Sequence, residues 1–253
     1  MTLTVFCILL FAALLHASWN AIVKASGDKM YAAIGVSGSA ALIALVMLPF
    51  APQPALVSAP YLLASCALQV VYTVLVAAIS VIFLGDRLSP LAWLGIGVIC
   101  LAILAMAFNG RASSRKGIVL ALINACFIAG YTLVDGTGVR LAGSALGYTL
   151  WTFFMNGFCL LCWAMVARRR EASRYLRQHW KKGILGGIGT MGSYGLALWA
   201  MTQAPLAVVA ALRETSILFG ALIAFIVLKE QLMPLRIVAA CGIAAGAILL
   251  RLA

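Results

Sequence analysis

Two ionisable residues, Arg213 and Glu214, stand side by side in the otherwise mostly apolar segment ALRETSILFGALIAFIVL. An ionisable residue in the middle of a membrane-spanning helix costs roughly 2.5–3.5 kcal/mol on insertion scales, so it usually faces a cavity or a partner. Successive helical residues point about 100° apart, which places Arg213 on one face with Ser216 and Glu214 on another. We expect Arg213 to line a cavity as a cation for an anionic or carboxylate substrate, with Glu214 as a proton-linked or structural partner. The alternative is a polar clamp between helices without substrate contact.

A second polar group lies in the first apolar segment. His16, Asn20 and Lys24 are spaced by four residues, which puts them on one stripe of a helix, and Trp19 lies beside that stripe. His16 is near the middle of the segment and can exchange protons near neutral pH, or it can hydrogen-bond a neighbouring helix. Lys24 is at the segment's end, where a lysine extends to the membrane surface. The stripe predicts a face turned toward the protein interior.

Further candidates occur in three other segments. ALINACF (121–127) aligns with ALLHASW (13–19), so Asn124 stands where His16 does, and Tyr131 and Asp135 follow on nearly the same face. Asp135 is expected at the end of its helix, exposed to solvent. Tyr72 and Tyr194 are candidates for a cavity wall, with packing as the alternative.

The composition indicates a membrane protein. Of 253 residues, 65% are hydrophobic and 9% are charged, with a mean hydropathy of +1.11, whereas soluble domains are about half apolar and a quarter charged. The net charge of +12 fits basic loops that stay in the cytoplasm, and no soluble domain is present to bind nucleic acid. No P-loop, H-E-x-x-H or G-x-S-x-G motif occurs, so we expect neither enzymatic activity nor a cofactor. We also expect no metal site, because the one C-x-x-C pair lies within an apolar segment.

The apolar segments predict an all-α integral membrane protein with about nine transmembrane helices, each about 20 residues long. The segments are 3–24, 31–50, 60–84, 91–108, 117–135, 146–167, 183–202, 206–228 and 235–252. The basic stretch 167–182 is expected to be a loop. Nine crossings place the N-terminus and the loops 51–59, 109–116, 168–182 and 229–234 on one side. That side has most of the lysines and arginines, so the positive-inside rule predicts that it is cytoplasmic.

The two halves of the chain resemble each other. VIFLGDRLSP (81–90) and FIVLKEQLMP (225–234) share an apolar helix end, a charged turn and a closing proline. We therefore expect two related repeats of four and five helices, residues 1–108 and 117–253, in the inverted arrangement that many transporters use. The first repeat is shorter by about one spanning helix, judged by the interval from Tyr72 to Pro90 against that from Tyr194 to Pro234.

These features together resemble the EamA-type members of the drug/metabolite transporter superfamily. The resemblance rests on HASWNAIVKASGDK (16–29), on the two repeated turns and on LRETSILFGALIAFIVLKE (212–230). It implies ten helices in two inverted five-helix repeats around a central cavity for amino acids, other metabolites or drugs. This chain departs from that pattern by lacking the fourth helix of the first repeat.

The resulting functional hypothesis is a multi-pass carrier for a small anionic or zwitterionic metabolite, working by gradient-driven alternating access in a bacterial inner membrane. The alternative is a shortened relative without transport activity, or a membrane subunit whose missing helix comes from a second copy in a homodimer. The expected partners are the lipid bilayer and a small-molecule substrate, and not nucleic acid.

Overall fold

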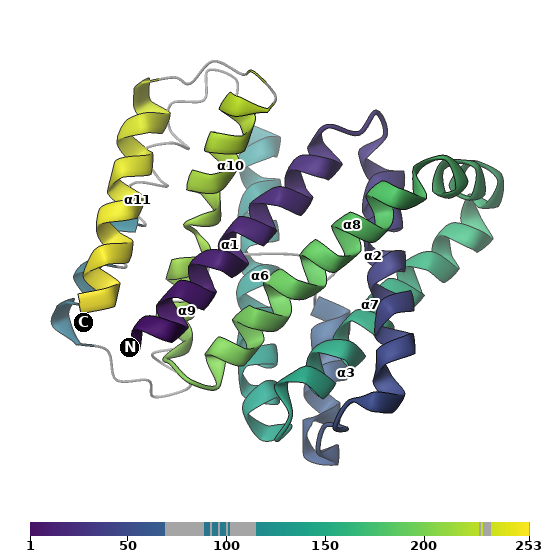
Figure 1. Cartoon of the computed structure of the whole chain (residues 1–253), viewed down its shortest axis with the longest axis horizontal. Helices are drawn as coiled ribbons and strands as arrows, with labels where there is room; N and C mark the ends of the chain where they lie inside the picture. The colour runs from purple at the N-terminus through teal and green to yellow at the C-terminus, as the bar shows by residue number, and fades with distance from the viewer. Residues whose placement is uncertain are drawn as a thin grey trace.

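The computed structural model describes residues 1–68, 89–91, 93–95, 97–99, 101, 115–227, 229 and 234–252, with backbone only for 66–68, 115–127, 234–237 and 239. In these residues the regular structure is entirely helical, as predicted (Figure 1). Two 3₁₀ turns, Leu48–Phe50 and Leu56–Ser58, join α2 to α3. The helices are α1 (Leu3–Lys24), α2 (Lys29–Met47), α3 (Ala59–Leu68), α6 (Arg115–Leu141), α7 (Ala145–Ala167), α8 (Arg169–Met201), α9 (Leu206–Arg213), α10 (Ser216–Ile226) and α11 (Pro234–Leu252).

Five described segments are long and apolar enough to cross a membrane: Leu3–Lys24, Lys29–Phe50, Ala145–Ala167, Arg169–Met201 and Leu206–Ile226. Many large apolar side chains on them are exposed, as expected of surfaces that face lipid. The fold class is therefore an all-α, multi-pass membrane protein. The predicted spans 60–84 and 91–108 lie largely outside the described residues.

The second half of α8 is the central helix of the described bundle. It lies between α1 and α2 in Figure 1 and also packs against α7. Glycines allow this close approach: a Cβ atom on Gly187 would lie 2.9 Å from the backbone nitrogen of Ala40, and one on Gly183 would lie 3.1 Å from Oγ of Ser39. The backbones of α2 and α8 therefore meet almost directly, as small residues permit in membrane bundles.

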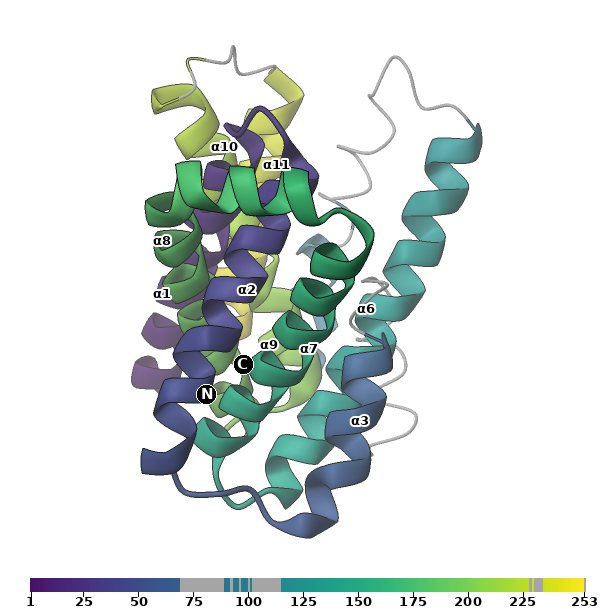
Figure 2. The ribbon, with the colours of Figure 1, turned by 90° about the vertical axis from the view of Figure 1, so that its right-hand side faces the viewer.

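The first half of α8 corrects one prediction. The stretch 167–182, expected as a loop, is helical from Arg169, and the helix turns at His179, whose φ of −121° and ψ of 20° are not helical. Figure 2 shows the segment before the turn lying across one end of the bundle. It is amphipathic, because Ala172 is buried in a cluster with Tyr31 whereas the arginines of this segment are exposed.

The termini lie on one face of the bundle. Nη1 of Arg251 donates a hydrogen bond to the carbonyl oxygen of Met1 over 3.3 Å. α7 begins on that face, next to the loop that joins α2 to α3, since the backbone nitrogen of Ala55 donates to the carbonyl oxygen of Ala142. α7 ends on the opposite face, which carries residues 168–182 (Figure 2).

The predicted placement of the N-terminus beside residues 168–182 is therefore wrong. In the described chain α3 begins on the face of the termini and α6 begins on the other (Figure 2). The count of nine helices and the division into repeats of four and five stay predictions, because residues 69–88 and 102–114 lie outside the described chain.

Candidate functional site

The span Leu206–Ile226 is interrupted at the RETS motif. α9 ends at Arg213 and α10 begins at Ser216. Between them the backbone N–H groups of Glu214 and Thr215 donate to carbonyl oxygens three residues back, each over 3.1 Å. The Thr215 hydroxyl donates to the carbonyl oxygen of Leu212 over 2.6 Å. The expected continuous helix 206–228 is thus two helices joined by a tight turn, a feature that often marks a functional hinge.

Arg213 lies at this interruption, with its guanidinium over an aromatic ring of α8. Its Cζ atom is 5.1 Å from the centroid of the Tyr194 ring, within the range of a cation–π interaction. Arg213 is half-buried, at the point where α1 packs against both α9 and α10. The motif therefore meets α1 and α8 at one place. Its expected role as a cavity-lining cation stays a prediction.

Asp135 is the fully buried acid of this region, and its predicted exposure at a helix end is wrong. α6 continues to Leu141, so Asp135 lies well inside the helix and its side chain is 0% exposed. Its Oδ1 accepts a hydrogen bond from the Tyr148 hydroxyl of α7 over 2.9 Å. Its Oδ2 accepts one from the Tyr194 hydroxyl of α8 over 2.5 Å. One carboxylate thus joins three helices.

Tyr194 links the two charged groups. Its ring contacts the Arg213 guanidinium and its hydroxyl contacts the Asp135 carboxylate. Tyr131 of α6 and Phe153 of α7 each pack edge-on against the same ring, with centroids 6.1 Å apart. Aromatic pairs of this geometry fix a ring's orientation. The result is a polar connection from the interrupted span to a buried acid.

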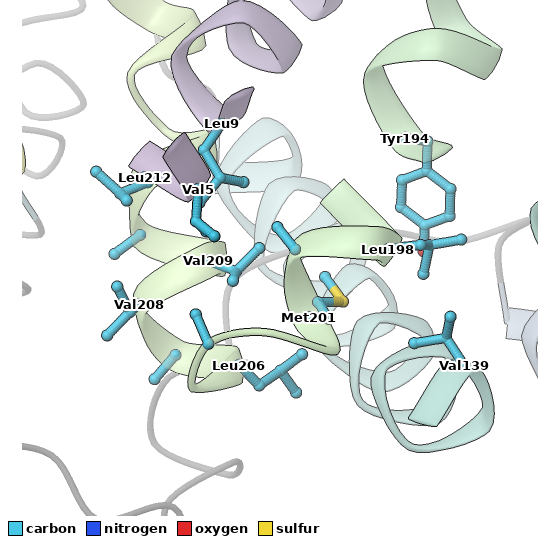
Figure 3. Close-up of a cluster of buried hydrophobic side chains, with 14 of the residues drawn as sticks. Val5, Leu9, Val139, Tyr194, Leu198, Met201, Leu206, Val208, Val209 and Leu212 are labelled. Carbon is cyan, nitrogen blue, oxygen red and sulfur yellow. The ribbon is translucent and has the colours of Figure 1, made fainter. Parts of the chain in front are cut away.

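The apolar core next to this connection draws side chains from most of the described helices, including α3, α7 and α11. Figure 3 shows Tyr194 and Leu198 of α8 with Val139 of α6 and with side chains of α1 and α9, all in one buried cluster. Leu206, Leu198 and Leu212 in it are fully buried. This packing holds the short helix α9 in place, and therefore fixes where Arg213 stands at its end.

The predicted stripe on α1 is only partly turned inward. His16 and Trp19 are half-buried, with ring centroids 5.3 Å apart in an edge-on arrangement. The indole Nε1 of Trp19 is buried and has no hydrogen-bond partner among the described residues. Asn20 is exposed, and its side-chain amide donates to the carbonyl oxygen of His16 in its own helix. Lys24 is exposed at the end of α1.

The remaining candidates divide into two groups. Tyr131 is buried against Tyr194, and Glu214 and Ser216 are half-buried beside the turn. Asn124 lies in α6 but its side chain is outside the description, and Tyr72 lies outside the described residues altogether. Sequence reasoning missed Tyr148, and no local pattern marks it. No group of three metal-ligating side chains occurs in the described part of the chain.

Comparison with known proteins gives the family. The EamA-like transporter family matches residues 115–252, a range that begins with α6 and ends with α11. This range contains Asp135, Tyr148, Tyr194 and Arg213, the residues of the polar connection. No curated protein matches the chain. Since the family match covers more than half of the sequence, the chain belongs to the EamA-like transporter family.

Proposed function

We propose that the chain is a carrier for a small metabolite with a carboxylate or other anionic group, and that Arg213 binds this group. The observation that supports the proposal most directly is the position of Arg213 at an interruption of a membrane span. Interrupted helices form the substrate and ion sites of many secondary transporters, near the middle of the bilayer. We further propose transport by alternating access in a bacterial inner membrane, driven by a gradient.

The chemistry of arginine favours an anionic substrate. A guanidinium has five N–H donors in one plane, and a carboxylate binds such a plane through two parallel hydrogen bonds. The Tyr194 ring, 5.1 Å from the Cζ atom of Arg213, supports the cation from one side. Trp19 of α1 adds a buried indole N–H without a partner in the described chain, which is suited to an acceptor oxygen of the substrate.

Asp135 is proposed as the proton-carrying group. A buried intramembrane acid is by default a candidate for a proton relay. When ionised, its carboxylate accepts the hydroxyl hydrogens of Tyr148 and Tyr194. Protonation would convert one oxygen into a donor and change the bond to Tyr194, whose ring supports Arg213. Substrate affinity would in this way depend on the proton gradient. Glu214 stays a second candidate for this role.

The first experiment measures ligand-dependent thermal stability of the purified protein against carboxylates, amino acids, organic phosphates and organic cations. We expect stabilisation by an anionic or zwitterionic compound. Arg213→Gln should weaken its binding at least tenfold, because a hydrogen bond to a charged group contributes roughly 1.5–3 kcal/mol. Arg251→Gln, at the end of α11, is the control and should bind normally. Preferential binding of cations, or unchanged binding by Arg213→Gln, would overturn the proposal.

The second experiment tests the proton. Asp135→Asn retains an acceptor for one tyrosine and can donate to the other, but it cannot exchange a proton near neutral pH. In proteoliposomes this variant should bind the substrate and no longer respond to a pH gradient. Asp28→Asn, at the N-cap of α2 outside the spans, is the matched control. Uptake by Asp135→Asn that still follows the pH gradient would exclude Asp135 as the proton carrier.

A second candidate function is that of a shortened relative or of a subunit completed by a second copy. It is favoured by the family match, which covers residues 115–252 and not the first half, where the proposed repeat 1–108 is shorter than the repeat 117–253. A homodimer would supply the missing helix. Light scattering of the reconstituted protein, combined with an uptake assay, tests whether a second copy completes the carrier. Uptake by a monodisperse monomer excludes completion by a second copy. Uptake by the dimer alone supports such completion.

A further inference from the structure

A cavity lies away from the polar connection, between α1, α2, α7 and α8. Its volume is about 310 Å³, and neither Arg213 nor Asp135 lines it. Its walls are mostly apolar, with Ala32 and Leu42 from α2, Leu161 from α7 and Ile184 from α8. Nothing in the proposed transport site accounts for this cavity.

The cavity is elongated along the bundle. Ala32 and Leu42 both line it and are ten residues apart in α2, which corresponds to about 15 Å along a helix axis. Ala32 is near the start of α2, on the face of the bundle that carries residues 168–182, whereas Leu42 lies well inside the span. The cavity thus runs from the membrane surface toward the bilayer interior, which is the path of an acyl chain.

The outer end of the cavity is basic and aromatic. His179, Trp180 and Lys182 line it where α8 turns from the membrane surface into the bundle. Trp180 is 56% exposed, as is usual for a tryptophan at a membrane–water interface. The adjoining amphipathic segment has one acid, Glu171, among a larger set of basic residues: Arg168, Arg169, Arg170, Arg174, Arg177, Lys181 and Lys182. This charge is complementary to an anionic headgroup.

We propose that this cavity binds an anionic phospholipid, with one acyl chain along α2 and the phosphate at Lys182. The apolar walls exclude a small polar solute, and a soluble anion would leave the length of the cavity empty. The basic segment distinguishes an anionic lipid from a neutral one. A lipid in this position contacts both the amphipathic half of α8 and the transmembrane half, and so stabilises the turn at His179.

The test titrates the purified full chain in detergent with phosphatidylglycerol and with phosphatidylcholine of the same acyl chains, and follows the thermal unfolding midpoint. We expect phosphatidylglycerol to raise the midpoint at lower concentrations than phosphatidylcholine. Lys182→Gln should weaken phosphatidylglycerol binding about fivefold, the effect of one basic residue near an anionic lipid. Arg251→Gln is the control, because Arg251 lies on the face of the termini, opposite residues 168–182, and does not line the cavity.

A second pair of variants tests the acyl chain. Ile184→Trp places a bulky side chain in the cavity and should abolish the stabilisation, whereas Ile188→Trp, one turn farther along α8 and 55% exposed, should not. Leu42→Trp blocks the cavity from α2 and replaces Ile184→Trp if that variant is not monodisperse. Three results would each overturn the proposal: equal effects of the two lipids, equal effects of Lys182→Gln and Arg251→Gln, or full stabilisation by glycerol 3-phosphate alone.

Discussion

Tyr194 makes two separate contacts that two substitutions can distinguish. Its hydroxyl donates to Asp135, and its ring lies beneath Arg213. Tyr194→Phe removes the first contact and keeps the second, whereas Tyr194→Leu removes both. Tyr148→Phe is the matched control, since it removes a hydroxyl bonded to the same carboxylate and leaves the ring beneath Arg213 in place.

The expected costs follow from the contacts. A polar contact between helices in a membrane contributes about 0.6 kcal/mol on average and up to about 1.7 kcal/mol, so Tyr194→Phe and Tyr148→Phe should each lower the free energy of unfolding by about 1 kcal/mol. Loss of the ring removes a cation–π contact with the half-buried Arg213 of about 1 kcal/mol. It also removes two edge-on aromatic contacts, with Tyr131 and Phe153, of about 0.5–1.5 kcal/mol each. Tyr194→Leu should therefore cost about 4 kcal/mol.

Thermal unfolding in detergent measures these differences. For a chain of this size 1 kcal/mol shifts the midpoint by roughly 2–4 °C, so the phenylalanine variants should lose about 3 °C and Tyr194→Leu about 10 °C. A double-mutant cycle with Arg213→Leu isolates the cation–π contact. Coupling to Tyr194→Leu without coupling to Tyr194→Phe is expected. If Arg213→Leu is additive with Tyr194→Leu, the guanidinium does not interact with the ring and the reasoning is refuted.

Three further predictions concern topology and packing. The basic residues of 168–182 should keep that face in the cytoplasm and both termini outside. In a cysteine-less background, an impermeant thiol reagent added outside should therefore label Gln203→Cys and not Gln178→Cys. The reverse labelling pattern would refute this orientation. Gly157→Ala should destabilise the protein by about 1–3 kcal/mol, because the new Cβ would collide with the carbonyl oxygen of Ser37. Gly220→Ala should be neutral or slightly stabilising, because no atom lies within 4 Å of the new Cβ. Equal thermal unfolding midpoints of the two variants would contradict the packing of α2 on α7. Arg140→Gln should lower the free energy of unfolding by about 1–3 kcal/mol, since Arg140 donates to the carbonyl oxygens of Met201 and Ala204 at the end of α8. If Arg140→Gln lowers the unfolding midpoint no more than Arg251→Gln does, these two hydrogen bonds do not stabilise the fold.

The sequence was informative where composition alone decides the structure. Apolar length predicted α1 and α7 closely, because a spanning helix needs about 20 apolar residues and little else. The RETS motif stood out for the same reason, since charge inside a span is costly. The structure of the basic stretch 168–182 was predicted wrongly, because its many charges favour a solvated loop. The apolar residues Ala172 and Leu176, four positions apart, are the helical signal in this stretch, and the charges outweigh it.

The candidate site was predicted less completely than the fold. Arg213, Tyr194 and Tyr131 were identified from their own segments, but their meeting depends on how α6, α8 and α9 pack, and one sequence contains no information on pairs. Asp135 was placed at a helix end because a charged residue usually ends an apolar segment. Inside the helix, the hydroxyls of Tyr148 and Tyr194 provide the hydrogen bonds that a buried carboxylate requires in place of water. Tyr148 was missed because its role exists only through its partner on another helix.

The glycine-mediated contact of α8 with α2 determines which pieces of the chain can exist alone. α1 and α2 come from the first half of the sequence, and the helix that covers their backbones comes from the second. Expressed separately, fragment 1–108 would expose the backbone at Gly35, and fragment 117–253 would expose it at Gly183. A lipid chain cannot pack against these surfaces as closely as the partner helix does. Each fragment alone should therefore be degraded, and the two expressed together should purify as one complex. A substitution at this contact in one half of the chain would then have to be compatible with the facing residues of the other half.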